Sequence, residues 1–300
     1  MTFNWKTFQI RTLTAIVFAA VMLTGLLWNY WSFLILFSII QFGCWWEYLK
    51  LSEKIYKTLI DTTIKYFFCI CGFLVFLAVG YSHYSYDFWW APFGYKLSLK
   101  WGLIILSIIC LFAFLFQNKQ LPDKLKWFVA VGLVYISLSL GLMINLSFWN
   151  KESFYVSEVL VQIKTTGIYS AFIPCSIVFS IWINDTMAYI VGSLIGKTPL
   201  SKISPKKTWE GTLGGIILAV LVAGIIAWQF GFDIKMMIII SAIASISGTF
   251  GDLLESKLKR MAGVKDSGSL MPGHGGFLDR FDSLLLAIPA VWLYIFLFIK

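Results

Sequence analysis

Long apolar stretches alternate with short polar segments along the whole chain. A helix that crosses a bilayer needs about 20 predominantly apolar residues, and nine stretches are close to or above that length. We place the nine predicted helices at residues 12–28, 30–48, 64–81, 101–116, 127–147, 169–194, 212–230, 236–254 and 281–299. The pattern therefore predicts an all-α, polytopic helical integral membrane protein.

The first two predicted helices are nearly continuous. They are broken at Trp28, Asn29, Tyr30 and Trp31, which leaves open whether both cross the bilayer or form a re-entrant pair. The first apolar stretch is long and lacks a small-residue cleavage site, so we do not expect it to be a removable signal peptide.

The motifs that suggest chemistry lie in the second half of the chain, whereas the first half is chemically quiet. We therefore distinguish an N-terminal transmembrane region, 1–168, with five predicted helices, from a chemically richer transmembrane region, 169–300. The longest polar segments of the second region are 196–211 and 255–280. Without a low-complexity linker between them, both regions are expected to belong to one integral membrane domain.

Composition and charge agree with this interpretation. Only 13% of residues are charged, against roughly 25% in soluble proteins. Of the 24 Lys and Arg residues, 18 fall in the N-terminus and in alternate loops, including 196–211 and 255–280. The positive-inside rule places these segments and the N-terminus in the cytoplasm and the C-terminus outside. The net charge of +9 reflects this asymmetry rather than a basic stripe on a soluble domain, so nucleic-acid binding is not expected.

Two carboxylates lie within apolar stretches. Glu47 lies near the cytoplasmic end of the second predicted helix, and we interpret it as an interfacial carboxylate because charge near a helix end costs little. Asp185 follows Asn184 well inside the sixth helix, where an ionisable group is costly, so we expect it to be functional. Gly192 and Gly196 share its helical stripe and favour close helix packing.

The segment 196–215 combines lysines, hydroxyl residues and glycines just before the seventh helix. Backbone N–H groups at a helix start, together with lysines, bind phosphate well. No Walker A pattern is present. A basic loop of this kind is also explained by cytoplasmic topology alone. The candidate phosphate-binding residues are Ser204, Lys206, Lys207 and Thr208.

Carboxylates gather again around the last polar segment. Asp252, Ser256 and Lys259 share one face at the end of the eighth helix, and Asp279 and Asp282 begin the ninth. Between them lies a turn rich in glycine and proline, 268–276. Carboxylates beside lysines at one membrane face are typical of a divalent-metal site for phosphoryl transfer.

Residues 256–282, SKLKRMAGVKDSGSLMPGHGGFLDRFD, resemble the signature of the phosphatidate cytidylyltransferases, also called CDP-diacylglycerol synthases. Met271 is a mild departure, since Leu or Ile is more usual there. Residues 184–189 and 204–211 resemble the upstream motifs of the same family, so the likeness covers about 180–283. The residues in register with the signature are Ser256, Lys259, Arg260, Lys265, Asp266, Pro272, Gly273, His274, Gly275, Gly276, Asp279, Arg280 and Asp282.

The resemblance implies that CTP and phosphatidate react to give CDP-diacylglycerol and diphosphate, with catalysis in 169–300. It implies Mg²⁺ and a second cation, either K⁺ or Mg²⁺, held by Asp252 and Asp279 with Ser256 and Asp282 assisting. Arg260 and Arg280 are expected to hold the phosphatidate headgroup. The other residues it implicates in catalysis or in binding CTP phosphates are Lys259, His274, Ser204, Lys206, Lys207, Thr208, Asp185, Lys265 and Asp266.

The resemblance further implies a homodimer in the bacterial cytoplasmic membrane, with the active site facing the cytoplasm. His274 is expected to organise the turn or donate a hydrogen bond, because an anionic lipid phosphate needs no strong base. Two alternatives remain from the residues: a CTP-dependent kinase of a polyprenol or another lipid, and a membrane transporter with Asp185 as its site.

Overall fold

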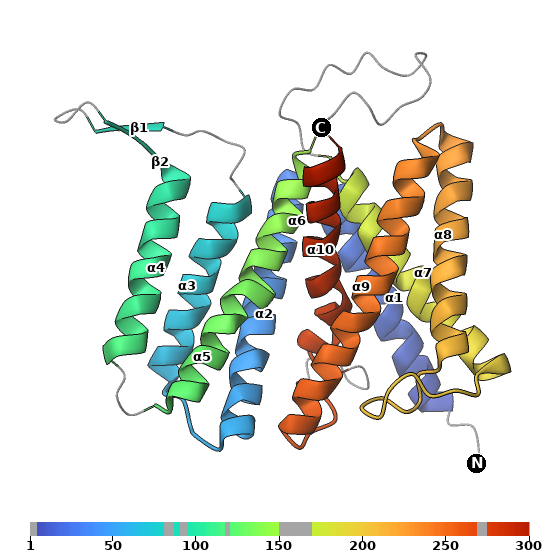
Figure 1. Ribbon diagram of the computed structural model, residues 1–300, viewed down its shortest axis with the longest axis horizontal. Coiled ribbons are helices and arrows are strands. Elements are labelled where there is room, and N and C mark those ends of the chain that lie inside the picture. Colours follow the sequence, from blue (N-terminus) through green and yellow to red (C-terminus); the bar gives the residue numbers. More distant parts are fainter. Residues whose placement is uncertain are drawn as a thin grey trace. The chain divides into compact units, whose positions relative to one another are not determined.

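The computed structural model describes residues 5–80, 87–90, 95–117, 121–149, 170–268 and 275–299. Within them the named elements are helices and one two-stranded antiparallel ribbon, β1 (Asp87–Trp90) and β2 (Tyr95–Ser98), joined by loops and turns (Figure 1). The helices are α1 (Trp5–Leu27), α2 (Tyr30–Tyr56), α3 (Thr62–Gly80), α4 (Leu99–Gln117), α5 (Asp123–Gly132), the π-helix η1 (Leu133–Leu138), α6 (Ser139–Ser147), α7 (Phe172–Ile195), α8 (Trp209–Phe230), α9 (Ile234–Met261) and α10 (Leu278–Phe298).

All nine apolar stretches coincide with helical segments, since α5, η1 and α6 form one continuous stretch over Asp123–Ser147. Among the described residues, seven helical segments are long and apolar enough to cross a membrane, and Thr12–Leu27 is a shorter apolar helix. The prediction of a helical membrane protein is confirmed. The ribbon was not expected, because its residues lie in the segment between the predicted helices 64–81 and 101–116, which is rich in Tyr, Phe and Trp.

The chain divides into two compact units. The first contains Met1–Asn145 and Leu258–Phe281, and the second contains Leu146–Lys257 and Asp282–Lys300. In the first unit α2 packs against α1, α3 and α5. Its core is aromatic: Trp45 stacks on Phe68 with ring centroids 6.0 Å apart, and Tyr48 stacks on Phe128 at 5.1 Å. Glu47 lies between these two core residues along α2.

The break between α1 and α2 has a local cause. Asn29 has an extended backbone and caps α2, because its side chain accepts a hydrogen bond from the Ser32 N–H at 2.8 Å. The Ser32 hydroxyl accepts one from the Asn29 N–H at 3.1 Å, which completes a capping box. Gly25 then allows Leu36 to pack closely against α1. The result is a tight pair of helices joined at Asn29.

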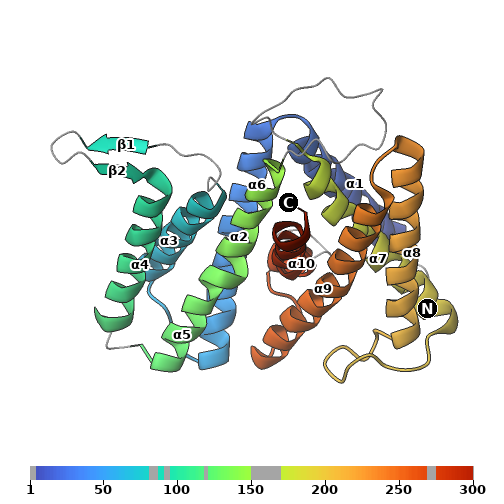
Figure 2. The ribbon, with the colours of Figure 1, turned by 45° about the horizontal axis from the view of Figure 1, so that its top comes forward.

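In the second unit α7 and α8 lie side by side along most of their length (Figure 2). Glycines make this approach possible: a Cβ on Gly211 would lie 2.7 Å from the Ala188 carbonyl oxygen, and one on Gly215 2.6 Å from that of Asn184. Gly192 and Gly196 pack against Thr208, so their predicted packing role is confirmed. The close contact fixes Asn184 and Asp185 relative to the start of α8.

Candidate active site

The segment between α7 and α8 is a small hairpin. Pro199 pairs with Thr208 as an antiparallel bridge, and the Leu200 N–H donates to the Lys207 carbonyl at 2.7 Å. The Lys207 N–H donates to the Ser204 carbonyl at 3.1 Å, which closes the turn. The hairpin thus presents Lys206, which is exposed, and Lys207, which is partly buried, at the start of α8.

Thr208 and Glu210 hold this hairpin to α8. Thr208 is the N-cap, and its Oγ1 accepts a hydrogen bond from the Gly211 N–H at 3.2 Å. The Glu210 carboxylate accepts from the N–H groups of Lys197 and Thr198, each at 3.2 Å. Thr208 was expected among the phosphate-binding residues, and the structure gives its hydroxyl a capping role.

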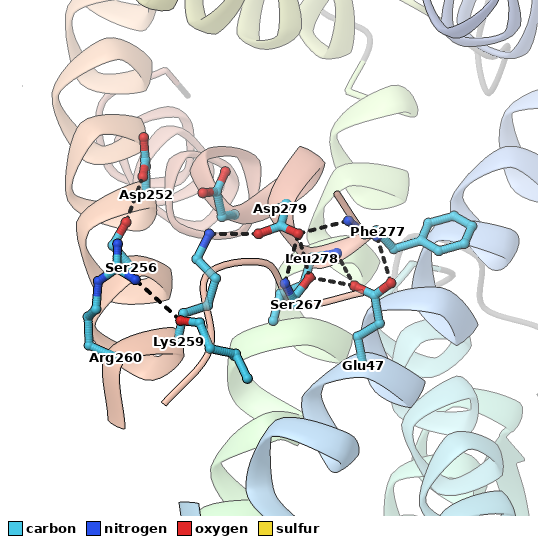
Figure 3. A network of polar contacts seen from close by, with 12 residues as sticks. Glu47, Asp252, Ser256, Lys259, Arg260, Ser267, Phe277, Leu278 and Asp279 are labelled. Atoms are coloured by element: carbon cyan, nitrogen blue, oxygen red, sulfur yellow. Dashed lines mark hydrogen bonds and ion pairs between the residues drawn. The ribbon is translucent and has the colours of Figure 1, made fainter. Parts of the chain in front are cut away.

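Lys207 contacts one predicted carboxylate of the second unit and interacts electrostatically with two others. The Lys207 ammonium forms an ion pair with Asp252 Oδ2. The Ser256 hydroxyl donates to Asp252 Oδ1 at 3.2 Å (Figure 3). Asp185 and Asp282 both interact electrostatically with Lys207 and with Asp252. One ammonium among three carboxylates leaves an excess of negative charge, which suits a bound cation.

Close backbone packing brings α9 and α10 together at this cluster. Gly251 lies against the backbone of Asp282, where any Cβ would overlap the Asp282 carbonyl oxygen. Asp282 is buried, and its carboxylate accepts from the Ser283 N–H at 2.6 Å. Asp185 accepts from the Asn184 side-chain amide at 3.3 Å. Helix packing, rather than loop geometry, therefore gathers these carboxylates.

Asp279 lies in the first unit, in a second polar network (Figure 3). Its Oδ1 pairs with the Lys259 ammonium at 2.6 Å, and both side chains are largely buried. Its Oδ2 accepts from the N–H groups of Ser267 at 2.9 Å and Gly276 at 2.8 Å. The Ser267 hydroxyl lies 2.9 Å from the same oxygen. Asp279 therefore organises the start of α10 in addition to any role with a cation.

Glu47 belongs to this second network, and the interpretation of Glu47 as an interfacial carboxylate is wrong. It is only 7% exposed, and its oxygens accept from Ser267 Oγ at 2.7 Å and from the N–H groups of Phe277 and Leu278 at 2.9 Å. The sequence contained one usable signal: a carboxylate inside the apolar face of a helix needs buried donors.

The other predicted residues lie at the surface or outside the described part of the chain. Arg260 is exposed and donates to the Val264 carbonyl at 3.3 Å. Lys265, Asp266 and Arg280 are also exposed. His274 lies outside the described residues. Ser204 is half-buried in the hairpin turn.

Among the described residues, no three His, Cys, Asp or Glu side chains lie close enough together to hold a metal ion by themselves. A divalent cation at this cluster would therefore need further oxygen ligands, such as substrate phosphates. Mg²⁺ prefers oxygen ligands and is typically bound by one or two carboxylates together with substrate phosphates. The second unit supplies such oxygens from Asp252, Asp282 and Ser256, with Asp185 adding negative charge. The same unit carries the basic hairpin, so these oxygen donors and the hairpin lysines belong to one set of helices.

Comparison with known proteins shows which family the chain resembles. The profile of the Cytidylyltransferase family matches residues 9–298. The chain is 31% identical to a phosphatidate cytidylyltransferase of Bacillus subtilis over 275 residues, which are 83% of this chain and 99% of that protein.

Local similarity is higher towards other relatives of the same name. Identity is 47% over 112 residues for the Staphylococcus haemolyticus protein, covering 36% of this chain and 43% of the relative. Identity is 46% over 119 residues for the Synechocystis protein, and the alignment covers 39% of this chain and 41% of the relative. These alignments span less than half the length of those relatives.

Proposed function

We propose, since the chain belongs to the Cytidylyltransferase family, that it transfers the cytidylyl group of CTP to phosphatidate and forms CDP-diacylglycerol and diphosphate. The observation that carries this proposal is the gathering of Asp185, Asp252 and Asp282 around Lys207, next to a basic hairpin at a helix start. The Bacillus subtilis relative, which is matched over 83% of this chain and 99% of its own length, is named a phosphatidate cytidylyltransferase.

The proposed chemistry is a displacement at the α-phosphorus of CTP. An oxygen of the lipid phosphate forms the new P–O bond, and the bond to the bridging oxygen breaks as diphosphate leaves. A phosphate monoester carries a charge of about −1.5 to −2 at pH 7, so the nucleophile is already deprotonated. The protein must therefore align the two substrates and neutralise their charge, as in phosphoryl transfer generally.

The basic residues would share this neutralisation. In the proposed assignment Lys206 and Lys207 hold CTP phosphates, together with Ser204 and the backbone at the start of α8. Arg260 and Arg280 hold the phosphatidate headgroup, because a planar guanidinium binds phosphate through two parallel hydrogen bonds. Lys265, Asp266 and His274 belong to the same signature and are proposed to support phosphate binding and the turn.

Mg²⁺ is the proposed cofactor. Asp252, Asp282 and Ser256 would hold it, with Asp279 as the further carboxylate of the signature and K⁺ or a second Mg²⁺ as an additional ion. When bound, such an ion neutralises phosphate oxygens and fixes them for in-line displacement. The buried Lys259 would keep Asp279 oriented through their ion pair.

The surroundings of the site follow from its two substrates. CTP comes from the cytoplasm and the acyl chains remain in lipid, so we place the site at the cytoplasmic face of the bacterial inner membrane. Nine crossings, a cytoplasmic N-terminus and an external C-terminus fit the distribution of 18 of 24 basic residues. We further propose that the protein forms a homodimer and does not bind nucleic acid.

Position-specific labelling of CTP tests the proposed reaction. Purified protein is incubated with Mg²⁺, with either phosphatidate or a polyprenol, and with CTP labelled at either the α- or the γ-phosphorus. The lipids are then separated by thin-layer chromatography. We expect only the α-label to enter lipid. Transfer of the γ-label to a polyprenol would indicate a lipid kinase, and solute flux into vesicles without CTP turnover would indicate a transporter.

A further inference from the structure

Glu47 is a buried carboxylate that the proposed chemistry leaves unexplained. It lies on α2, in the N-terminal half of the chain, between the buried aromatic residues Trp45 and Tyr48. Removing a carboxylate from water costs several kcal/mol unless hydrogen bonds replace the lost hydration. Its position therefore requires strong partners.

Those partners come from the start of α10, more than 200 residues later in the sequence. Glu47 Oε1 accepts from the Phe277 N–H and Oε2 from the Leu278 N–H, both at 2.9 Å (Figure 3). N–H groups at the start of a helix have no acceptor within that helix, and they favour negative charge. Glu47 thus caps α10 from a different helix.

The local sequence makes room for this contact. A Cβ on Gly268 or on Gly276 would overlap the Glu47 carboxylate, and one on Gly43 would overlap the Phe277 ring. Gly43 and Glu47 are four residues apart and share one face of α2. The three glycines therefore leave space for the Glu47 carboxylate and the Phe277 ring. This close fit indicates a specific contact between α2 and the start of α10.

Ser267 links Glu47 to Asp279. Its hydroxyl lies 2.7 Å from Glu47 Oε2 and 2.9 Å from Asp279 Oδ2, so a single hydroxyl proton lies between the two carboxylates. The backbone N–H groups of Ser267 and Gly276 donate to the same Asp279 oxygen. Glu47 and Asp279 therefore both accept hydrogen bonds from Ser267 and from the backbone at the start of α10.

We infer that Glu47 is a positioning residue for cytidylyl transfer: it fixes the first turn of α10 and, through Ser267, the orientation of the Asp279 carboxylate. The inference rests on the proposed function, in which Asp279 is one of the site's carboxylates. It assigns to α2 a part in a site that the sequence motifs place entirely in the second half of the chain.

The central test is Glu47→Gln, which keeps the side chain's size. An amide has only one oxygen, so its NH₂ group must face at least one of the Phe277 and Leu278 N–H donors. Lost charge-assisted hydrogen bonds should lower kcat about tenfold to a hundredfold. The KM values for CTP and phosphatidate should stay near the wild-type values, because Glu47 is buried and its described hydrogen bonds are to the protein itself. General misfolding would not produce this separation of kcat from KM.

Glu53→Gln is the matched control. Glu53 lies on the same helix and also accepts a backbone N–H, from Ile60 at 2.7 Å, and pairs with Lys65 at 2.9 Å. It makes no described contact with 267–279, so its kcat should equal that of the wild type. Equal losses of kcat in both variants would overturn the inference.

Ser267→Ala tests the link between Glu47 and Asp279. It still tests the inference if Glu47→Gln cannot be purified. It should lower kcat, and the double variant should be no slower than Glu47→Gln alone, because both changes break one connection. Losses that multiply, or a wild-type kcat in either single variant, contradict the inference.

Amide hydrogen exchange without substrates gives a readout independent of activity. Exchange at 276–279 should be faster in Glu47→Gln than in the wild type or in Glu53→Gln, because the N–H groups of Phe277 and Leu278 lose an acceptor. Unchanged exchange at 276–279 would overturn the inference that Glu47 fixes the first turn of α10. Failure of the wild type to label lipid from α-labelled CTP would instead overturn the proposed function and leave the exchange result standing.

Discussion

Asp252 and Asp279 have different surroundings, although the signature pairs them. Asp252 is partly exposed and contacts Lys207 and Ser256, whereas Asp279 is largely buried and holds Lys259 and the start of α10. An isosteric change of each residue should therefore have a different consequence for stability, even where both abolish turnover.

We predict that Asp252→Asn lowers kcat about a hundredfold or more, because charge stabilisation in the site is lost, and leaves thermal unfolding nearly unchanged. Asp279→Asn should abolish turnover and also destabilise the protein by up to about 3–5 kcal/mol, because it removes the carboxylate charge that pairs with the largely buried Lys259 ammonium. Activity and unfolding of both variants, measured in the same detergent, test this. Equal stability of the two variants would contradict the structural role given to Asp279.

The two lysines of the hairpin also differ. Lys207 reaches Asp252, whereas Lys206 is exposed. Lys207→Gln should raise the KM for CTP about tenfold to a hundredfold and lower kcat, with the phosphatidate KM unchanged. Lys206→Gln should affect only the CTP KM. Lys202→Gln, an exposed lysine of the same hairpin, is the control. An effect of Lys207→Gln on phosphatidate alone would reverse the assignment of the two basic groups.

At the scale of elements, the junction of α7 and α8 places Asn184 and Asp185 beside the start of α8. We predict that Gly215→Ala lowers the unfolding temperature and raises the CTP KM, because its Cβ would lie 2.6 Å from the Asn184 carbonyl oxygen. Gly224→Ala is the matched control in α8, since its Cβ would meet Ile238 at an ordinary 3.4 Å. Equal unfolding temperatures for the two variants would contradict the close packing.

Helix positions were predictable from sequence because apolar length is a local property. Asn29 likewise marks the break between α1 and α2 through its own side chain. The gathering of Asp185, Asp252 and Asp282 was not predictable from spacing, because it depends on how closely glycines let three helices approach.

Glu47 was misjudged for the same reason. Its partners, Ser267, Phe277 and Leu278, are more than 200 residues away, and no helical periodicity connects them. A pattern of residues along α2 shows that a carboxylate is buried but not which donors meet it. The ribbon over Asp87–Ser98 was missed because its aromatic residues also suit a membrane interface.

At the scale of the whole molecule, the distribution of basic residues predicts the orientation in the membrane. In a variant lacking the native cysteines, single cysteines at Lys202 and Lys257 should react with a membrane-impermeant reagent only from the cytoplasmic side. A cysteine at Lys300 should react only from outside. The 18 basic residues of the N-terminus and alternate loops give the physical reason. Labelling of Lys202Cys from outside would contradict the orientation and the access of CTP.

The central claim is the transfer of a cytidylyl group to a lipid phosphate, and phosphorus NMR of a complete reaction tests it most directly. With purified protein, CTP, phosphatidate and Mg²⁺, the phosphatidate monoester signal should disappear while diphosphate-ester signals of a nucleotide lipid and free diphosphate grow in equal amounts. The same mixture with Asp252→Asn should remain unchanged. Release of CDP, or consumption of CTP while the phosphatidate signal persists, would contradict the account.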